Sequence, residues 1–581
     1  MIAVFLLFTM LLTGCSIQNQ NATASKQQTT SANTTKLENP FTSRDLSGEV
    51  NEDTAIKITL NNDKTNVDED GVQMVDGDLV ISKEGTYILE GELENGQVRV
   101  DADENAKIQI VLNGVTLTCQ DGPAIQIMKA DKVFLTLGKD TKNSVTDGSK
   151  YDLADGEDEP NAAIYSKADL TINGEGTLVV NGNYKHGIVS KDDLKIASGT
   201  IQVKAVGDGI KGKDLVAIAD GTITITAKGD GITSAGIIEI KDGDFAITTN
   251  GGSENSTKTA KGDENPMGGQ PSQGQQPPQM PSGQQPPSNG TGQQGAPSKE
   301  KPQEPPAGQK NNQETATTQD GTSSKGLKAE TKLYIYGGSF KINTSDDGIH
   351  AGGNIVISNG DIQISSGDDG IHADNKLTIT GESIQITESY EGLEAADILV
   401  SDGTVTIVSS DDGFNASGGT NVTSTDQKQG QKGFGNIEDV SIVIQGGTIT
   451  VNANGDGIDS NGTLLVSGGT TTVYGPVNDG NGPIDYGSEA TVTGGSIIAG
   501  GSSGMAEGFT TSKNQGSILS KLSSVVKANT EIVITDSNGN QVVTYTSPKD
   551  LSALIFSTSD IKKGETYTIK AGSISTRVVA E

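Results

Sequence analysis

Residues 345–374 read SDDGIHAGGNIVISNGDIQISSGDDGIHAD, and the segment Asp-Asp-Gly-Ile-His occurs in them twice, at 346–350 and again at 368–372. The glycine of this segment belongs to a series whose members lie about 22 residues apart, except where the series is interrupted: Gly187, Gly209, Gly231, Gly326, Gly348, Gly370, Gly392, Gly413 and Gly457. An interval in the low twenties that recurs many times indicates one supersecondary unit stacked repeatedly. We therefore expect a repeat protein whose function depends on what the stack displays.

A second series of glycines runs in step with the first, and each member precedes a short segment of alternating polar and apolar residues: Gly199, Gly221, Gly243, Gly338, Gly360, Gly381, Gly403, Gly447 and Gly469. Such alternation is typical of strands that bury one face. Short strands, glycine turns and coils of about 22 residues predict an all-β fold, a right-handed parallel β-helix. Leucine-rich repeats share the interval, but their Leu-rich consensus is absent.

The chain is strongly acidic, with a formal net charge of -33 over 581 residues and a pI near 4.4. This charge argues against a nucleic-acid partner, because the phosphates would be repelled. It favours cations, or anionic partners that are bridged by cations. We expect one elongated domain that functions as a monomer.

The N-terminus predicts export. Residues 3–14 are apolar and end in Leu-Thr-Gly-Cys, the pattern of a lipoprotein signal peptide (1–15) in which Cys15 is lipidated. An ordinary signal peptide is the alternative. Only Cys119 then remains, so we expect a buried free thiol and no internal disulfide. The predicted location is the extracellular face of the cell membrane, with contact to the membrane through the lipid anchor alone.

Composition divides the rest of the chain. Residues 16–45 are rich in Ser, Thr, Asn and Gln and predict a disordered tether. Residues 46–515 carry the β-helix, interrupted by a Gln/Pro/Gly-rich insert at 253–325 and a polar insert at 418–436. Residues 516–581 lose the repeat and predict a small C-terminal β cap or module.

The acids before the glycines predict columns of carboxylates. Equivalent residues of successive coils lie roughly 5 Å apart, so these acids repel one another unless a cation intervenes. Dense oxygen ligands outside the cell favour Ca²⁺. The alternative is that Asp-Gly is ordinary turn chemistry, left solvated. The candidate Ca²⁺ ligands are Asp208, Asp230, Asp346, Asp347, Asp368, Asp369, Glu391, Asp411, Asp412 and Asp456.

The three histidines also occur at these turns: His186, His350 and His372. Ligand and catalytic roles are open to them, but we favour membership of a side-chain ladder. Tyrosines offer faces on which sugar rings stack, although scattered surface tyrosines are often neutral. The weak candidates for carbohydrate contact are Tyr184, Tyr390, Tyr474 and Tyr486.

The segments Gly-Thr-Tyr-Ile-Leu-Glu-Gly (85–91), Gly-Gln-Val-Arg-Val-Asp (96–101), Leu-Asn-Gly-Val (112–115), Gly-Pro-Ala-Ile (122–125) and Asp-Lys-Val (131–133) precede the Asp-Gly-Ile coils. With those coils, they resemble the bacterial family of β-helical carbohydrate-binding domain proteins. The resemblance covers roughly residues 45–500. It implies a polysaccharide-lyase-like fold, Ca²⁺ at the Asp turns, and binding to plant cell-wall glycans such as cellulose or acidic pectin. The absence of Trp weakens the expectation of binding to crystalline glucan.

We therefore predict a noncatalytic, surface-anchored protein that binds acidic polysaccharide through Ca²⁺. One alternative is a polysaccharide lyase or hydrolase on the same fold. A lyase needs a strong base beside Ca²⁺, and no Arg lies within the repeats; inverting hydrolysis needs an acid and a base about 6.5–9.5 Å apart, which paired Asp residues could supply. A second alternative is a structural adhesin or spacer that Ca²⁺ only rigidifies.

Overall fold

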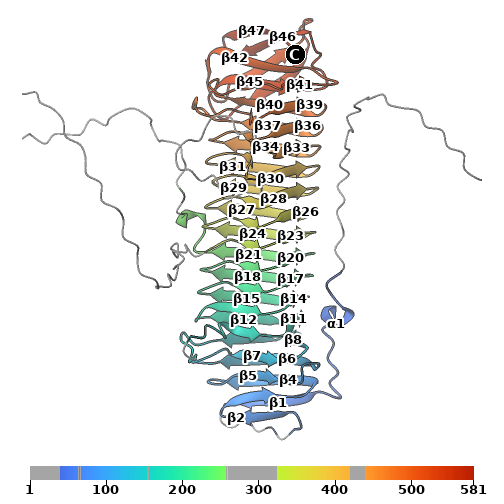
Figure 1. The fold of residues 1–581 in the computed structure, drawn as a ribbon, viewed down its shortest axis with the longest axis vertical. Coiled ribbons are helices and arrows are strands. Elements are labelled where there is room, and N and C mark those ends of the chain that lie inside the picture. The colour runs from blue at the N-terminus through green and yellow to red at the C-terminus, as the bar shows by residue number, and fades with distance from the viewer. Residues whose placement is uncertain are drawn as a thin grey trace, which may run out of the picture. The chain divides into compact units, whose positions relative to one another are not determined.

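Each regular coil contributes three short strands, and each strand pairs in parallel with its equivalents in the neighbouring coils (Figure 1). This computed structural model describes residues 39–62, 65, 67, 69–153, 156–256, 258, 323–418 and 439–581. Met1–Pro40 and Phe41–Glu581 are separate units, and the solenoid belongs to the second. In its central part, Ile188, Ile210 and Ile232 are register partners in successive coils, as the spacing of the glycines predicts.

Three sheets result. Sheet 1, which follows the turn with the repeated glycine, contains β2 (Val72–Val75), β3 (Asp78–Ile81), β5 (Val98–Asp101), β7 (Ile125–Lys129), β10 (Ala162–Ser166), β13 (His186–Ser190), β16 (Ile210–Gly212), β19 (Ile232–Ser234), β22 (Leu327–Ala329), β25 (Ile349–Ala351), β28 (Ile371–Ile379), β30 (Leu393–Val400), β32 (Phe414–Ala416), β35 (Ile458–Ser460) and β38 (Asp485–Tyr486).

Sheet 2 shares β28 and β30 with sheet 1, because these longer strands continue around the corner. Its other strands are β1 (Ile56–Asn61), β4 (Gly85–Leu93), β6 (Lys107–Thr118), β8 (Lys132–Leu137), β11 (Asp169–Gly174), β14 (Leu194–Ile196), β17 (Leu215–Ile218), β20 (Ile237–Ile240), β23 (Lys332–Ile335), β26 (Asn354–Ile357), β33 (Ser441–Ile444), β36 (Thr463–Val466), β39 (Glu489–Val492) and β41 (Thr511–Ser512).

Sheet 3 begins with the paired ends of β1, β4 and β6. It continues through β9 (Lys142–Thr146), β12 (Thr177–Gly182), β15 (Thr200–Ala205), β18 (Thr222–Ala227), β21 (Asp244–Thr249), β24 (Ser339–Thr344), β27 (Asp361–Ser366), β29 (Ser383–Glu388), β31 (Thr404–Ser409), β34 (Thr448–Ala453), β37 (Thr470–Tyr474) and β40 (Ser496–Gly501).

The last coil is covered by the C-terminal residues. β45 (Leu551–Ser557) pairs antiparallel with β40 and with β42 (Ser517–Val526). A separate antiparallel sheet contains β44 (Gln541–Thr546), β43 (Glu531–Thr535), β46 (Thr566–Ala571) and β47 (Ile574–Val579). The expected all-β parallel β-helix with a small C-terminal β cap is confirmed.

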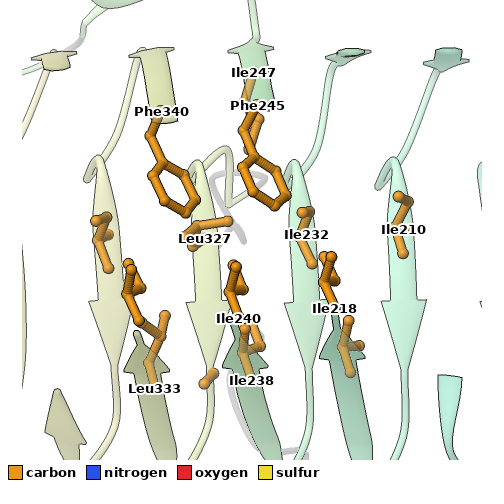
Figure 2. Packing of buried hydrophobic residues seen from close by; sticks show 14 of the residues in the cluster. Ile210, Ile218, Ile232, Ile238, Ile240, Phe245, Ile247, Leu327, Leu333 and Phe340 are labelled. Atoms are coloured by element: carbon orange, nitrogen blue, oxygen red, sulfur yellow. The ribbon is translucent and has the colours of Figure 1, made fainter. Parts of the chain in front are cut away.

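The core consists of ladders of equivalent aliphatic side chains. Ile210, Ile232 and Leu327 follow one another on sheet 1 and are completely buried (Figure 2). Phe245 and Phe340 stack face to face at 4.4 Å between ring centroids. Burial of one such side chain is worth about 1.5–3 kcal/mol, so stability accumulates along the stack. Cys119 is a buried free thiol, as predicted.

Close packing explains why glycine returns at the same point of successive coils. A Cβ atom on Gly209 would lie 2.5 Å from Cγ2 of Ile225 and 2.7 Å from the carbonyl O of Gly231 in the next coil. The second glycine series has a different cause, since Gly221 has φ of 137°, a conformation that side chains disfavour. In one coil this role passes from Gly381 to Glu382, which has φ of 59°.

The tether expected over residues 16–45 ends earlier than predicted. The short helix α1 (Ser43–Leu46) has a capping box between Thr42 and Asp45, and Asp45 is completely buried. Its carboxylate binds Lys132 Nζ at 2.6 Å and accepts a hydrogen bond from Thr171 at 2.7 Å. A buried ion pair therefore attaches this segment to the outer face of sheet 2.

The first insert is also shorter than predicted at both ends. The 3-10 helix η1 (Ser253–Asn255) and Ser324 belong to the packed solenoid, with Ser253 and Ser324 buried. β19 pairs directly with β22, and β30 with β33, so the coils on either side of each insert are in register. The rest of both inserts, the signal peptide, Cys15 and most of the tether lie outside the described residues. Within the described part of the chain, no helix is long and apolar enough to cross a membrane.

Candidate functional site

The residue before each repeated glycine stands in one column, which we call the acid column. From Gly187 to Gly413, the backbone N–H of each repeated glycine donates to the carbonyl of the column residue in the next coil, for example from Gly209 to Asp230. In chain order the column contains His186, Asp208, Asp230, Lys325, Asp347, Asp369, Glu391, Asp412 and Asp456. Lys325, which sequence reasoning did not include, occupies the coil between Asp230 and Asp347.

One oxygen of most column carboxylates has a structural role. Asp208 Oδ1 accepts the backbone N–H of Asp230 at 3.1 Å, and Asp412 Oδ1 accepts that of Asp456 at 2.6 Å. The same contact joins Asp347 to Asp369 at 3.2 Å. A buried backbone N–H needs such a partner, so these acids are part of the fold whether or not they hold an ion.

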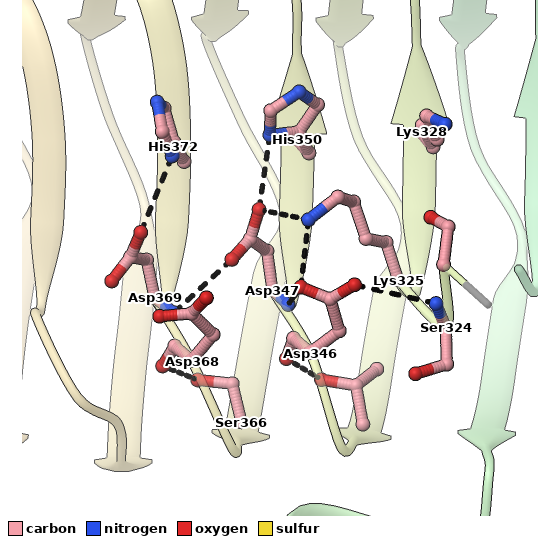
Figure 3. A network of polar contacts seen from close by, with 12 residues as sticks. Ser324, Lys325, Lys328, Asp346, Asp347, His350, Ser366, Asp368, Asp369 and His372 are labelled. Atoms are coloured by element: carbon pink, nitrogen blue, oxygen red, sulfur yellow. Dashed lines mark hydrogen bonds and ion pairs between the residues drawn. The ribbon is translucent and has the colours of Figure 1, made fainter. Parts of the chain in front are cut away.

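In the middle of the solenoid, the chain supplies its own cations. Lys325 Nζ lies 2.7 Å from Asp346 Oδ1 and 2.6 Å from Asp347 Oδ2 (Figure 3). Lys258 pairs with Asp368. Burial opposes ionisation of Asp347, but hydrogen bonds from His350 and Lys325 and the ammonium charge hold its pKa below the usual range. Asp346, Asp347 and Asp368 are close enough to hold a metal, but the lysines already neutralise them.

The C-terminal part of the column is different. Asp412, Asp456 and Asp459 each offer an oxygen within 4.8 Å of the others, and we call these three residues the C-terminal acid cluster. Burial, followed by the charges of neighbouring acids, raises the pKa of Asp412 to about 9. Burial and the nearby charges of Asp459 and Asp485 raise that of Asp456 to about 7. Among the described residues, no lysine or arginine pairs with Asp412 or Asp456.

One coil before Asp412, Glu391 has a similar environment. Burial and the charge of Glu394 raise its pKa to about 7, although the amide of Asn415 donates to it at 2.8 Å. Asp411, the remaining predicted ligand, precedes Asp412 in the same turn. The predicted acids thus divide into a part that lysines neutralise and a part where acids gather, with Asp369, the partner of His372, between them.

A second column, the outer column, runs beside the first. Its members are the second residues after the repeated glycine or its equivalent: Val189, Lys211, Thr233, Lys328, His350, His372, Glu394, Asn415, Asp459 and Asp485. Its side chains change from basic at Lys211 and Lys328 to acidic at Asp459 and Asp485. Sequence reasoning missed this column, although the constant offset from the glycines is a signal that could have found it.

His350 and His372 are register partners in the outer column, so they form a side-chain ladder. Their Nδ1 atoms lie 3.0 Å from Asp347 Oδ2 and 3.2 Å from Asp369 Oδ2, respectively. Burial opposes protonation of His372, but Asp369 and Glu394 raise its pKa to about 9. His186 stands apart: it is buried, its pKa falls to about 4 because of that burial, and its Nδ1 accepts the backbone N–H of Asp208.

The four candidate tyrosines all have partners within the protein. Tyr184 stacks on Tyr151 at 4.1 Å, and Tyr474 lies 5.7 Å from Tyr545. Tyr390 is buried beneath the ammonium group of Lys258. Tyr486 donates to the carbonyl of Gly508 at 2.6 Å.

A different tyrosine pair presents an aromatic face. The rings of Tyr334 and Tyr336, at the outer surface of sheet 2, are nearly parallel at 8° with centroids 6.1 Å apart. Both side chains are partly exposed. Two residues of the same type at period two, one in β23 and one directly after it, are the sequence signal that could have identified them.

The fold and these columns define a parallel β-helix protein with an extended charged face. A family model described as "Carbohydrate-binding domain-containing protein" matches residues 75–370, which is 296 of the 581 residues. The chain belongs to this family, which confirms the resemblance seen in the sequence and supports a carbohydrate-binding role.

A relative in Acetivibrio thermocellus, described as a carbohydrate-binding domain-containing protein, is 40% identical over 155 residues. The match covers 26% of this chain and 54% of the relative, so it spans about half of that protein. A solved structure of a polysaccharide lyase-like protein from C. thermocellum, a gadolinium derivative, is 26% identical, with a TM-score of 0.37. It covers 56% of this chain and 96% of its own.

Proposed function

We propose that the protein binds an acidic, pectin-like polysaccharide along the outer face of sheet 1, through Ca²⁺ held by the C-terminal acid cluster. The observation that carries this proposal is the convergence of Asp412, Asp456 and Asp459 without an ammonium partner on Asp412 or Asp456 among the described residues. Membership of the carbohydrate-binding domain family is the reason for proposing a carbohydrate as the ligand.

The cluster fits Ca²⁺ chemically. All its donors are carboxylate oxygens, which this hard cation prefers, and Ca²⁺ takes six to eight oxygen ligands. The raised pKa values of Asp412 and Asp456 indicate that buried negative charge is insufficiently compensated by the protein alone. A bound divalent cation would compensate it. Three carboxylates leave coordination positions for water and for a ligand.

Net charge explains why the ion is needed. A chain with net charge -33 repels a polyanion, so direct attraction to uronate carboxylates is unfavourable. Ca²⁺ at the cluster would bridge protein and glycan. Farther along the outer column, the ammonium groups of Lys211 and Lys328 already pair with Asp208 and with Asp230 and Glu330, so the bridging falls to the ion.

We infer that the protein is a noncatalytic binder. Lys325, the lysine of the acid column, is held as an ammonium between Asp346 and Asp347 and so does not supply the base that a lyase needs. A lyase base must instead accept a proton. Release of unsaturated or reducing-end products from polygalacturonate, with Ca²⁺ present, would support the enzymatic alternative; no product formation supports the binder.

We also infer attachment to the outside of the cell membrane through lipid on Cys15. The support is the apolar segment that ends at Leu-Thr-Gly-Cys. Mass spectrometry of the mature protein tests this directly, since a diacylglyceryl group on Cys15 is expected in the wild type. A Cys15→Ser variant should be released from the membrane fraction. Retention of that variant contradicts the lipid anchor.

The binding experiment compares polygalacturonate with neutral cellulose, each with Ca²⁺ and with chelator. We expect retention by polygalacturonate only when Ca²⁺ is present. Circular dichroism under the same conditions must show an unchanged fold, because loss of the solenoid would also abolish binding. If no polysaccharide is retained while Ca²⁺ still raises the unfolding temperature, the protein is a spacer that the ion rigidifies.

A further inference from the structure

We propose that His350, His372, Asp369 and Glu394 form a second metal site, which binds a borderline divalent transition metal ion represented by Zn²⁺. This site lies on sheet 1 and is separate from the C-terminal acid cluster. Neither the family description nor the Ca²⁺ proposal assigns it.

The register of the β-helix brings these residues together. His350, His372 and Glu394 are consecutive members of the outer column on β25, β28 and β30. Asp369 is the acid-column residue of the same coil as His372 (Figure 3). The backbone ladder therefore fixes the order and spacing of these residues along sheet 1.

Two overlapping groups of ligand atoms meet at His372. His372 Nδ1 lies 3.2 Å from Asp369 Oδ2 and 3.2 Å from Glu394 Oε2. Asp369, His372 and Glu394 offer ligand atoms within 4.8 Å of one another, and so do Asp347, His350 and His372. The ligand atoms of a tetrahedral zinc site lie about 3.4 Å apart, so Asp369, His372 and Glu394 need only small side-chain movements. His350, whose ligand atom lies within 4.8 Å of that of His372, must turn from Asp347 toward them.

Asp347 and Asp369, the aspartates beside the two histidines, differ in whether a lysine already binds them. Asp347 already binds the ammonium of Lys325 at 2.6 Å. Within the described ranges, no lysine or arginine pairs with Asp369 or Glu394. We therefore assign the oxygen ligands to Asp369 and Glu394, and leave Asp347 with its lysine.

The donor set selects the metal. Two imidazole nitrogens and two carboxylates suit Zn²⁺ and its neighbours, whereas Ca²⁺ prefers oxygen alone. Access from solvent exists, since the side chains of His350, His372 and Glu394 are 18%, 26% and 22% exposed. Four protein ligands complete a closed, structural shell. The ion would therefore connect three successive coils.

The test is a calorimetric titration of Zn²⁺ into the full chain, without a polyhistidine tag and in excess Ca²⁺. We expect one Zn²⁺ per chain. The double variant His350→Gln/His372→Gln should bind it at least about tenfold more weakly. Co²⁺ provides an independent readout, because a four-coordinate ion has visible absorption bands that the double variant should lack.

Two further variants keep the result interpretable. Glu394→Gln alters one partly exposed ligand and should also weaken Zn²⁺ binding, while circular dichroism confirms that it folds. Asp459→Asn, in the C-terminal acid cluster, should leave Zn²⁺ affinity unchanged. Equal Zn²⁺ affinity in wild type and in both ligand variants, or no Zn²⁺ uptake in excess Ca²⁺, would overturn the proposal.

Discussion

Asp412 Oδ1 lies 2.6 Å from the backbone nitrogen of Asp456 in the next coil and accepts its hydrogen. A single carboxylate therefore joins two coils and, in the same position, contributes to the C-terminal acid cluster. Its hydrogen-bonding and charge can be separated by substitution, because an amide oxygen accepts the same hydrogen without carrying the charge.

Asp412→Asn and Asp412→Ala should therefore differ. In the absence of Ca²⁺, Asn keeps the acceptor and replaces a carboxyl group whose charged form burial disfavours, so the free energy of unfolding should be unchanged or higher. Ala leaves the buried N–H of Asp456 unpaired, which costs about 1–3 kcal/mol. Both variants should bind Ca²⁺ more weakly. Denaturant unfolding and Ca²⁺ calorimetry measure the two effects; equal unfolding free energies for Asn and Ala would contradict the structural role.

The acid cluster also predicts a pH dependence. The pKa of Asp412 is about 9 and that of Asp456 about 7, both above the unfolded value of roughly 4. The native state without Ca²⁺ thus holds more protons than the unfolded state, so stability falls as pH rises from about 4 to 9. Ca²⁺ replaces these protons, so its affinity should rise over the same range. Unfolding curves in chelator and in Ca²⁺ test this, and a Ca²⁺ affinity that does not change with pH counts against the cluster as the site.

The ion pair that attaches α1 should give a pH dependence of stability with the opposite sign. Burial raises the pKa of Asp45, but the hydrogen bonds from Lys132, Thr171 and Thr42 outweigh this effect and lower the pKa to about 2. Its contribution of about 2–3 kcal/mol is present above pH 4 and is lost as pH falls through 2. Asp45→Ala should destabilise by about 3–5 kcal/mol at neutral pH, because it leaves Lys132 buried without its partner. The exposed Asp53→Ala is the matched control, and equal unfolding midpoints for the two variants would exclude this role.

The repeated glycines before sheet 1 should be intolerant of side chains for steric reasons. Gly209→Ala would place Cβ 2.7 Å from the carbonyl O of Gly231, and overpacking of this kind costs about 1–3 kcal/mol. Gly480→Ala is the control, since its Cβ would approach only Asn478 Oδ1, at 3.4 Å. Its effect should stay within about 0.5 kcal/mol. Thermal unfolding compares the two, and an equally mild effect at Gly209 would refute the close-packing explanation.

Much of the fold could be predicted because the repeat constrains it locally. Gly209 and Ile210 are neighbours in the sequence, and an equivalent pair occupies the same environment in successive coils. The interval between these pairs therefore gives the coil length, and the apolar residue of each pair identifies one ladder of the core. Alternation at period two then identifies which side chains point inward. The same periodicity predicted that the acids before the glycines stand in a column.

The site was harder to predict because its lysines lie at the two ends of the insert that interrupts the repeat. Lys258 lies near the start of the first insert and its partner Asp368 lies two coils beyond the end of that insert, while Lys325 is the last residue of the insert as predicted. Only the coordinates show that these lysines neutralise the middle acids and leave the C-terminal acids together. Asp45 escaped prediction for a related reason: a segment with the composition of a tether is fixed by a buried lysine on β8.

The most direct test is calorimetry of an oligogalacturonate titrated into the full chain with saturating Ca²⁺, for wild type and for Asp412→Asn/Asp456→Asn. We predict binding by the wild type only with Ca²⁺, and at least about tenfold weaker binding by the variant, whose circular dichroism remains native. Equal affinity in chelator, or equal affinity of wild type and variant, would contradict a Ca²⁺ bridge at these two carboxylates.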